Sequence, residues 1–437
     1  MNLIEQVKMA GVVGAGGGGF PTYVKISSKA DIIIANGAEC EPLLHKDAAV
    51  MENFAQYLVK GMQLSMEATG AKEGFIGIKG KNKDAIKTVN SLCKGLPIKV
   101  FILGDYYPTG DEFDLVYTIT GRLIPPAGIP IQVGVVVNNV ETLMNIAKAA
   151  QGEPVIKKTL TIAGAVKNPC TVTVPVGISY RECIDIAGGL ATDNAVLFIG
   201  GLMMGSVTDD FETPVTKTST GVVVLPRNHI VSKRRLLSRQ DMAKIGKSAC
   251  DQCRYCTELC PRFLLGYQVE PHQVMRSLAF TATGEDHWNQ FAALCCSCGL
   301  CTLFSCPEGL FPKETCDNAK EQMKKMGIKL SFSKDIKPHP LRDGRRVPVK
   351  KLVKKLDIEE YNAPAPYIGE MNYVKRVNLL LKQAAGSPNK PLVKVGDKVK
   401  EGQQVGEIPN GALGAVVHSS IDGVVVSVDS DKICIER

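Results

Sequence analysis

The sequence predicts a multidomain α/β protein, and three observations lead to that prediction. The chain has 437 residues, a length that usually divides into two to four domains. Its N-terminal third alternates helical patterns with apolar strands such as Asp31–Ala35, and its C-terminal end is typical of short β-hairpins. Between these parts lie two groups of cysteines flanked by helical patterns. We therefore expect several small folds of different classes, joined in series.

The N-terminus and the hydropathy favour a cytoplasmic location. The first residues, MNLIEQVKMAGVVGAGG, contain neither a basic segment nor a long apolar segment, so no signal peptide is predicted. The longest apolar run, around Val133–Val137, is the size of a strand, whereas a membrane span needs about 18 residues. We expect no direct membrane span, and any membrane contact must be made through a partner.

A net charge of +8 is concentrated in a basic run from Lys324 to Lys355. We expect this run to be a solvated face, with docking of an acidic redox partner as the alternative. Phe332 is the only Phe, Tyr or Trp within it and no nucleic-acid motif is present, so nucleic-acid binding is not predicted. Its later members are Arg342, Arg345, Arg346, Lys350, Lys351, Lys354 and Lys355.

A glycine run, Gly14–Gly19, comes directly after the first helical pattern. Such glycines let backbone N–H groups approach an anion closely, so the run predicts a phosphate cradle. Its spacing also satisfies the G-x-G-x-x-G dinucleotide fingerprint, but that motif must follow a strand and open a helix. Here Ile4–Val13 is a helical pattern and Pro21 interrupts the next segment, so we reject the fingerprint. The strand Asp31–Ala35 comes later and ends at Asn36–Pro42, where ligands of open α/β sheets bind.

The stretch from Lys158 to Asp210 has a different pattern. Strand-like segments at Thr159–Ile162 and Thr171–Val174 flank a turn, and an amphipathic helix over Ser179–Ala187 ends at two glycines. We expect this unit to be a small folded spacer, with ligand binding as the alternative. Met203 and Met204 are expected to fill gaps in its core.

Eight cysteines occur as two CxxCxxC triplets, each followed by one further cysteine and a proline. This is the ligand pattern of a pair of [4Fe–4S] clusters, in which the fourth cysteine of each group binds the other cluster. One cluster would be held by Cys250, Cys253, Cys256 and Cys306, and the other by Cys295, Cys298, Cys301 and Cys260. A zinc site or a disulfide frame would not explain two such triplets. Most of the remaining cysteines, Cys40, Cys93, Cys170, Cys183, Cys296, Cys316 and Cys434, are expected to be small buried hydrophobic residues.

Four motifs of the N-terminal third, together, resemble a known module. GAGGGGFPTYVK, NGAECEP, GDEFDLVYTITGR and NNVETL occur in that order. They are similar to the flavin module shared by the 51-kDa subunit of respiratory complex I, the Rnf complex C subunit and the cobalamin reductase of propanediol utilisation. NGAECEP, with alanine at position 38, is the form found in the last two of these branches. The resemblance extends over nearly the whole chain.

The resemblance implies a domain order. Residues 1–150 would be the FMN- and NADH-binding α/β domain, and 155–232 a β-grasp (SLBB) domain with its return segment. Residues 233–330 would be a helical, ferredoxin-like domain with two [4Fe–4S] clusters, and 331–390 a basic linker. Residues 391–437 would be a barrel-sandwich hybrid. Because the tip of its hairpin, Pro409–Gly414, has no lysine, we expect this last domain to be structural and not a swinging carrier arm.

The resemblance also implies roles for individual residues. Lys25 would contact the flavin and Asn36 would hydrogen-bond its ring edge. Glu39 would lie in the same flavin and nucleotide site. The FMN phosphate and ribityl chain would be bound by Gly14, Gly16, Gly17, Gly18, Gly19, Asn138, Asn139 and Thr142. The nicotinamide nucleotide would be bound by Phe20, Glu41, Asp111 and Glu112. No catalytic acid or base is implied, since hydride transfer needs none.

The implied function is transfer of electrons from NADH through FMN and the two clusters, since a flavin converts hydride chemistry into single-electron chemistry. The expected acceptor is cobalamin, either free or bound to a corrinoid or redox protein. The alternative is an electron-input subunit of a larger complex, of the Rnf type or with a methylene-tetrahydrofolate reductase. The implied location is the cytoplasm. Two settings there are consistent with the resemblance: the inside of a bacterial microcompartment and the periphery of a membrane complex.

Overall fold

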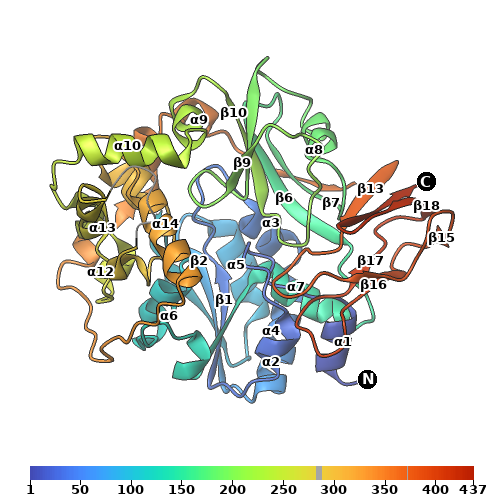
Figure 1. The fold of residues 1–437 in the computed structure, drawn as a ribbon. Helices are drawn as coiled ribbons and strands as arrows, with labels where there is room; N and C mark the ends of the chain where they lie inside the picture. The colour runs from blue at the N-terminus through green and yellow to red at the C-terminus, as the bar shows by residue number, and fades with distance from the viewer. Residues whose placement is uncertain (282–287, 372) are drawn as a thin grey trace.

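The N-terminal domain contains a parallel sheet in the order β3-β2-β1-β5. Figure 1 labels its two central strands, β1 and β2. The computed structural model describes residues 1–281, 288–371 and 373–437. The apolar run of β1 is buried on both faces, as is usual when helices cover a parallel sheet on both sides. The strands are β1 (Ile32–Gly37), β2 (Glu73–Lys79), β3 (Ile98–Leu103) and β5 (Val135–Asn139). The helices are α1 (Leu3–Met9), α2 (Thr22–Ile26), α3 (Lys46–Asn53), α4 (Ala55–Thr69), α5 (Lys83–Leu92), α6 (Glu112–Thr120) and α7 (Val140–Ala149).

The register of this sheet brings two of the sequence motifs together. Strands β1 and β5 are parallel neighbours, and Asn36 pairs with Asn139 where both strands end. The segments after these strands therefore start at one edge of the sheet, as the sequence predicts for a ligand site. The first helix is shorter than its pattern, because Gly11 has a φ of 66° and Val13 pairs with Pro21 instead of continuing the helix. A helix does follow the glycines, but it is short: α2 begins at Thr22 and ends at Ile26.

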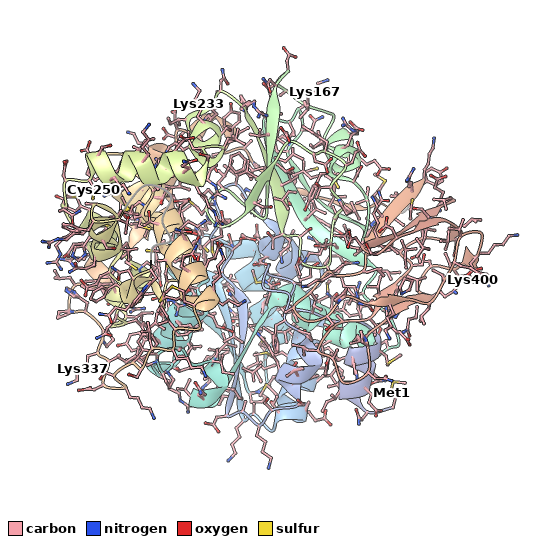
Figure 2. The ribbon with its side chains drawn as sticks, in the orientation of Figure 1. Met1, Lys167, Lys233, Cys250, Lys337 and Lys400 are labelled. Atoms are coloured by element: carbon pink, nitrogen blue, oxygen red, sulfur yellow. The ribbon has the colours of Figure 1, made fainter. Side chains whose placement is uncertain are left out.

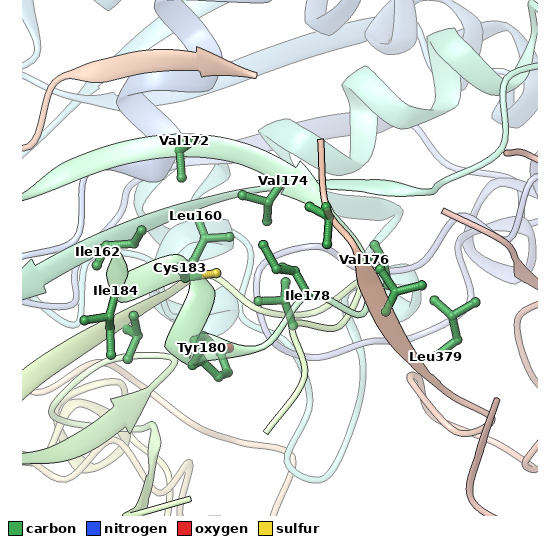
Figure 3. Close-up of a cluster of buried hydrophobic side chains, with 14 of the residues drawn as sticks. Leu160, Ile162, Val172, Val174, Val176, Ile178, Tyr180, Cys183, Ile184 and Leu379 are labelled. Atoms are coloured by element: carbon green, nitrogen blue, oxygen red, sulfur yellow. The ribbon is translucent and has the colours of Figure 1, made fainter. Parts of the chain in front are cut away.

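A mixed six-stranded sheet forms the second domain, in the order β12-β7-β6-β10-β8-β9. The predicted hairpin is β6 and β7, and the predicted helix is α8, whose N-cap Ser179 forms a capping box with Glu182. Figure 3 shows the core between this hairpin and α8, with Leu379 of a later strand beside Val176. The elements are β6 (Lys157–Gly164), β7 (Cys170–Pro175), α8 (Tyr180–Ile186), β8 (Ala195–Ile199), β9 (Ser206–Thr208), β10 (Gly221–Pro226) and β12 (Tyr367–Glu370).

Short helices surround the cysteine groups. Helices α10, α13 and α14 pack on one another, as the three helical patterns predict. Figure 2 places Cys250 on the opposite side of the view from Lys400 of the C-terminal domain. The helices are α9 (Ile230–Arg235), α10 (Arg239–Ala249), α11 (Tyr255–Glu258), α12 (Pro261–Leu264), α13 (Pro271–Leu278) and α14 (Pro312–Lys325), with a π-turn at Cys301–Ser305. No described helix has both the length and the apolar character that crossing a membrane requires.

Two small antiparallel sheets form the C-terminal domain, residues 376–437. One has the order β13-β19-β18-β15 and the other β14-β16-β17. Their buried valines and isoleucines join the core of the second domain, so the two domains share one hydrophobic cluster. The strands are β13 (Arg376–Leu380), β14 (Lys390–Pro391), β15 (Lys398–Val399), β16 (Gln404–Glu407), β17 (Val417–His418), β18 (Gly423–Val428) and β19 (Lys432–Glu436).

The prediction of a linker over 331–390 is wrong. Strand β11 (Val347–Pro348) pairs with β4 (Tyr106–Tyr107) of the first domain, and α15 (Val349–Lys355) comes directly after it. Strand β12 then extends the second sheet, and β13 opens the C-terminal one. The segment therefore pairs with strands of three other domains, namely β4, β7 and β19.

The expected solvated basic face is also only partly correct. The lysines of α15 are exposed, but Arg342 is buried and donates to Asp114 and to Thr118, with 2.8 Å for the second contact. Arg345 forms an ion pair with Glu258. These arginines hold the segment against α6 and the cluster domain, so their charge serves the packing of this chain.

Candidate functional site

A cavity of about 930 Å³ lies at the carboxyl ends of β1 and β5, between the first and second domains. The glycine loop and Asn36–Glu41 form one side. Residues 199–206 and 216–220 of the second domain form the other. Thirteen of the fifteen residues predicted to bind FMN or NADH line it: Gly14, Gly16, Gly17, Gly18, Gly19, Phe20, Lys25, Asn36, Glu39, Glu41, Asp111, Glu112 and Asn139. The other two, Asn138 and Thr142, lie behind its wall.

The glycine loop has the properties of a phosphate cradle. Ala15 N–H donates to Thr142 Oγ1 at 2.9 Å, and Gly14 N–H donates to Phe20 O, which fixes the ends of the loop. Within the described chain, the N–H groups of Gly16, Gly17 and Gly18 have no protein acceptor. A Cβ atom at Gly17 or Gly18 would meet nothing within 4 Å, and Gly17 has a φ of 105°. Free amides facing open space fit an FMN phosphate.

A buried ion network supports this loop from beneath. Lys158 of β6 donates to Ala15 O at 2.8 Å and pairs with Glu141 of α7. Lys46 lies 3.1 Å from the same carboxylate and 2.7 Å from Asp47. Burial lowers the pKa of Lys158 to about 8, despite the adjacent carboxylate. Burial raises the pKa of Glu141, but the positive charges of Lys158 and Lys46 outweigh burial, so this pKa is lowered overall.

The three predicted asparagines have different surroundings. Asn36 donates to Gly110 O at 3.0 Å and accepts from Ala38 N–H, so it joins the end of β1 to the start of α6. Asn139 donates to Asp47 at 3.0 Å and accepts from Lys46 at 3.2 Å. Asn138 is buried, and its Nδ2 has no partner in the described chain. This free donor, behind the cavity wall, is a polar atom that a bound group could satisfy.

Glu39 and Glu41 are carboxylates in a cleft that should attract an anion, and the structure explains how they are accommodated. Burial, and next the charge of Asp47, raise the pKa of Glu39 to about 8, so it is largely neutral at pH 7. Glu41 accepts from the N–H groups of Met203 and Met204 at 2.9 and 2.8 Å. Its oxygens are therefore directed at the loop 200–205 and not at the glycine loop.

The predicted nicotinamide residues are partly engaged by the protein. Asp111 caps α6 through Phe113 N–H and Asp114 N–H, and its other oxygen pairs with Arg262 of α12 at 2.9 Å. Glu112 lies 3.7 Å from Lys25, whose Nζ also donates to Val137 O at 2.8 Å. Phe20 is 37% exposed at the cavity edge, where a planar ring could stack on it.

The cysteines meet in the two sets that the sequence predicts. Cys260 lines one pocket with Cys295, Cys298 and Cys301, joined by Cys296. We call this set the inner cysteine site. Cys306 neighbours Cys250, Cys253 and Cys256, which we call the outer cysteine site. In each set, a triplet and the fourth cysteine of the other group come together, which fits a cube of iron and sulfur with four thiolates.

Cys298 lines both the inner pocket and the large cavity. Its carbonyl accepts from the hydroxyl of the buried Tyr107 at 2.6 Å. The loop 200–205 also lies against this site, since a Cβ at Gly299 would be 2.8 Å from Met203 O. Arg235 holds the loop through the carbonyls of Leu202 and Met203. The cavity and the inner cysteine site are therefore adjacent.

Three features differ from the sequence-based expectations or were absent from them. Met204 is 53% exposed and lines the cavity, so only Met203 fills the core. Cys40 also lines the cavity, and burial raises the pKa of its thiol to about 12. Cys93, Cys170, Cys183, Cys316 and Cys434 are buried as expected. The supporting lysines 46 and 158 were not predicted, because no local pattern reports that a distant strand lies beneath the loop.

Comparison with protein families agrees with these parts. The Nuo51 FMN-binding domain model matches residues 7–148, the SLBB model 159–207, and the 4Fe-4S dicluster model 249–311. The RnfC barrel sandwich hybrid model matches 333–436, which includes most of the supposed linker. The fold class, the FMN module and the iron–sulfur clusters expected from the sequence are thus confirmed.

Relatives match over different lengths. Cobalamin reductase PduS of Salmonella typhimurium is 40% identical over 99% of this chain and 96% of its own length. The C subunit of the Na⁺-translocating ferredoxin:NAD⁺ oxidoreductase complex of Acetobacterium woodii is 36% identical over 59% of this chain and 57% of its own. A solved NAD⁺-reducing [NiFe]-hydrogenase chain, 20% identical, covers 74% of this chain and 60% of its own with a TM-score of 0.49, a likeness too weak to add to the fold.

Proposed function

Since this chain belongs to the family of the cobalamin reductase PduS, we propose that it oxidises NADH and delivers the electrons to cobalamin. The full-length match to that reductase carries the proposal, because the Rnf-type relative matches only part of either chain. The acceptor is either free cobalamin or cobalamin bound to a partner protein. A cytoplasmic setting, inside a microcompartment, belongs to the same proposal.

FMN, when bound, exchanges two electrons with a nicotinamide and single electrons with an iron–sulfur cluster. We assign its phosphate to the free amides of Gly16, Gly17 and Gly18. Thr142, Lys46 and Lys158 act from behind by fixing the peptide groups of the loop. The neutral form of Glu39 lets an anion occupy the same cavity without charge repulsion.

The nicotinamide nucleotide is assigned to the cavity edge beside Phe20 and Glu112, and to the loop 200–205 opposite. Glu41 and Arg235 position that loop, since one binds its N–H groups and the other its carbonyls. The inner cysteine site is assigned as the nearer cluster site, because Cys298 reaches the cavity wall. The outer cysteine site, with Cys253 exposed, faces the acceptor.

Protein reconstituted with iron, sulfide and FMN tests the proposal by stopped-flow absorbance. NADH should bleach the flavin, and added cob(III)alamin should then be reduced with restoration of the flavin band. Viologen and ferredoxin serve as comparison acceptors. Reduction of ferredoxin and viologen at full rate, without reduction of cobalamin, would contradict the acceptor while leaving the electron path intact.

A further inference from the structure

Lys217 is a buried lysine with no carboxylate partner among the described residues. It is 3% exposed, and its Nζ donates to Gly11 O at 2.9 Å and to Val416 O at 2.7 Å. Burial alone lowers its pKa to about 7. Placing a lysine there is costly, and a hydrophobic residue would avoid that cost. The two carbonyls it joins belong to the N-terminal and the C-terminal domains, while Lys217 itself belongs to the second.

The contacts around Lys217 reach both ends of the glycine loop. Gly11 lies just before the loop, at the end of α1. At the other end, Ala385 N–H of the C-terminal domain donates to Gly19 O at 3.0 Å. A Cβ at Gly19 would lie 2.9 Å from the side chain of Thr218 and 3.4 Å from Ala384. The loop is therefore enclosed between the segment 216–220 and the segment 383–385.

These two segments are also tied to each other. Gln383 Oε1 accepts from the Lys217 N–H at 3.1 Å, and Gln383 Nε2 donates to Leu380 O at the end of β13. The chain from β13 through Gln383 and Ala385 is thus fixed relative to the glycine loop. The carbonyls of the loop are held from outside, while the amides of Gly16–Gly18 stay free for a ligand.

We propose that Lys217 is a positioning residue through which the C-terminal domain holds the glycine loop in its FMN-binding conformation. This gives a role to a barrel-sandwich domain that has no carrier lysine at its hairpin tip. The inference rests on the proposed placement of FMN at that loop. The domain acts on flavin retention, and the lysine joins three domains at one point.

Two variants, Lys217→Met and Gln383→Leu, each remove one tie with little change in volume. FMN binding is measured by quenching of flavin fluorescence, and hydrogen exchange is measured on the peptide spanning residues 11–20. Losing one or two buried hydrogen bonds should raise the FMN dissociation constant about tenfold. Exchange in that peptide of the FMN-free protein should become faster, while the cluster absorbance stays unchanged.

Two control variants separate positioning from general destabilisation. Val405→Ala opens the buried core of the C-terminal domain without touching the loop, and Lys390→Met removes an exposed charge from the same domain. Val405→Ala should lower the Tm yet leave FMN affinity close to the parent value. The proposal is overturned if Val405→Ala weakens FMN binding as much as Lys217→Met, or if both tie variants bind FMN as the parent does.

Should Lys217→Met fail to fold, Gln383→Leu decides by the same readouts, because it leaves the lysine in place. Parent protein that binds no FMN at all would instead refute the proposed function. Failure of the two proposals is therefore distinguishable.

Discussion

The triplets of the inner and outer cysteine sites have the same CxxCxxC spacing in the sequence, but the two sites have different surroundings in the structure. At the inner site, Cys260, Cys298 and Cys301 are buried, and Arg262 lies against it, paired with Asp111. At the outer site, Cys253 is exposed, and Cys250 and Cys306 are partly so. Ligand spacing therefore indicates which cluster type forms, whereas the packing around each loop determines which site adjoins the large cavity and which faces solvent.

The largest effect is expected when one cysteine ligand is removed from each site. Cys301→Ala and Cys253→Ala should each lower iron from about eight to about four atoms per chain. In Cys253→Ala, NADH should still produce the paramagnetic signal of the inner cluster. In Cys301→Ala, NADH should bleach the flavin without any cluster signal, although dithionite reveals the outer one. The reverse pattern would show that the two sites are assigned the wrong way round.

The next variant tests whether both sites depend on the flavin cavity. Gly17→Leu places a side chain where the structure has open space, at a φ that side chains rarely adopt. FMN affinity should fall at least 100-fold, about 3 kcal/mol. NADH should then reduce neither cluster, while iron content is unchanged. Flavin stoichiometry equal to that of the parent protein would show that the phosphate binds elsewhere.

A smaller effect is expected when one arginine is removed beside each site. Arg262 is buried beside the inner site, with its guanidinium 3.5 Å from the Phe113 ring, whereas Arg254 is exposed beside the outer site. A positive charge favours the reduced cluster, so Arg262→Gln should lower the inner potential by about 1 kcal/mol, or ~40 mV for one electron. Arg254→Gln should change the outer potential much less, because solvent screens it. Redox titration followed by electron paramagnetic resonance measures both, and equal shifts would contradict the difference in burial.

The smallest expected effect is a pH dependence of FMN binding. The pKa of Glu39 is raised to about 8, so its carboxyl group is mostly neutral below that pH and charged above it. An FMN phosphate is dianionic between pH 7.5 and 9.5. The FMN dissociation constant should therefore rise between pH 7.5 and 9.5, by less than about tenfold. In Glu39→Gln it should stay flat, and an equally steep rise in that variant would assign the titration to another group.

The features that the sequence predicts well are those that a local pattern carries. The cysteine triplets, the glycine loop and the helix that begins after Ser179 each depend on a short stretch of chain, and the structure has them where expected. The exchange of Cys260 and Cys306 between sites was predicted as well, because the two-cluster rule links distant cysteines by a fixed geometry.

What the sequence misses depends on partners far away in the chain. Strand β11 has two residues and exists because β4 offers it an edge, so a proline-rich, basic composition wrongly predicts a linker. Arg342 is buried because Asp114 and Thr118 lie opposite it, more than two hundred residues earlier. Met204 is exposed because Glu41 binds the backbone of its loop. The hydrophobic pattern of the sequence does not predict any of these long-range contacts.

The lysine beneath Ala15 bears on how such proteins can be recombined. A fragment that ended after α7 would keep every glycine of the loop and would lose Lys158, which lies in β6. Its Glu141 would face Lys46 alone, and the Ala15 carbonyl would lose its closest donor. A chimera of two family members would therefore take this charge network from one parent only if the crossover lies beyond β6, because the network extends past the end of the first domain.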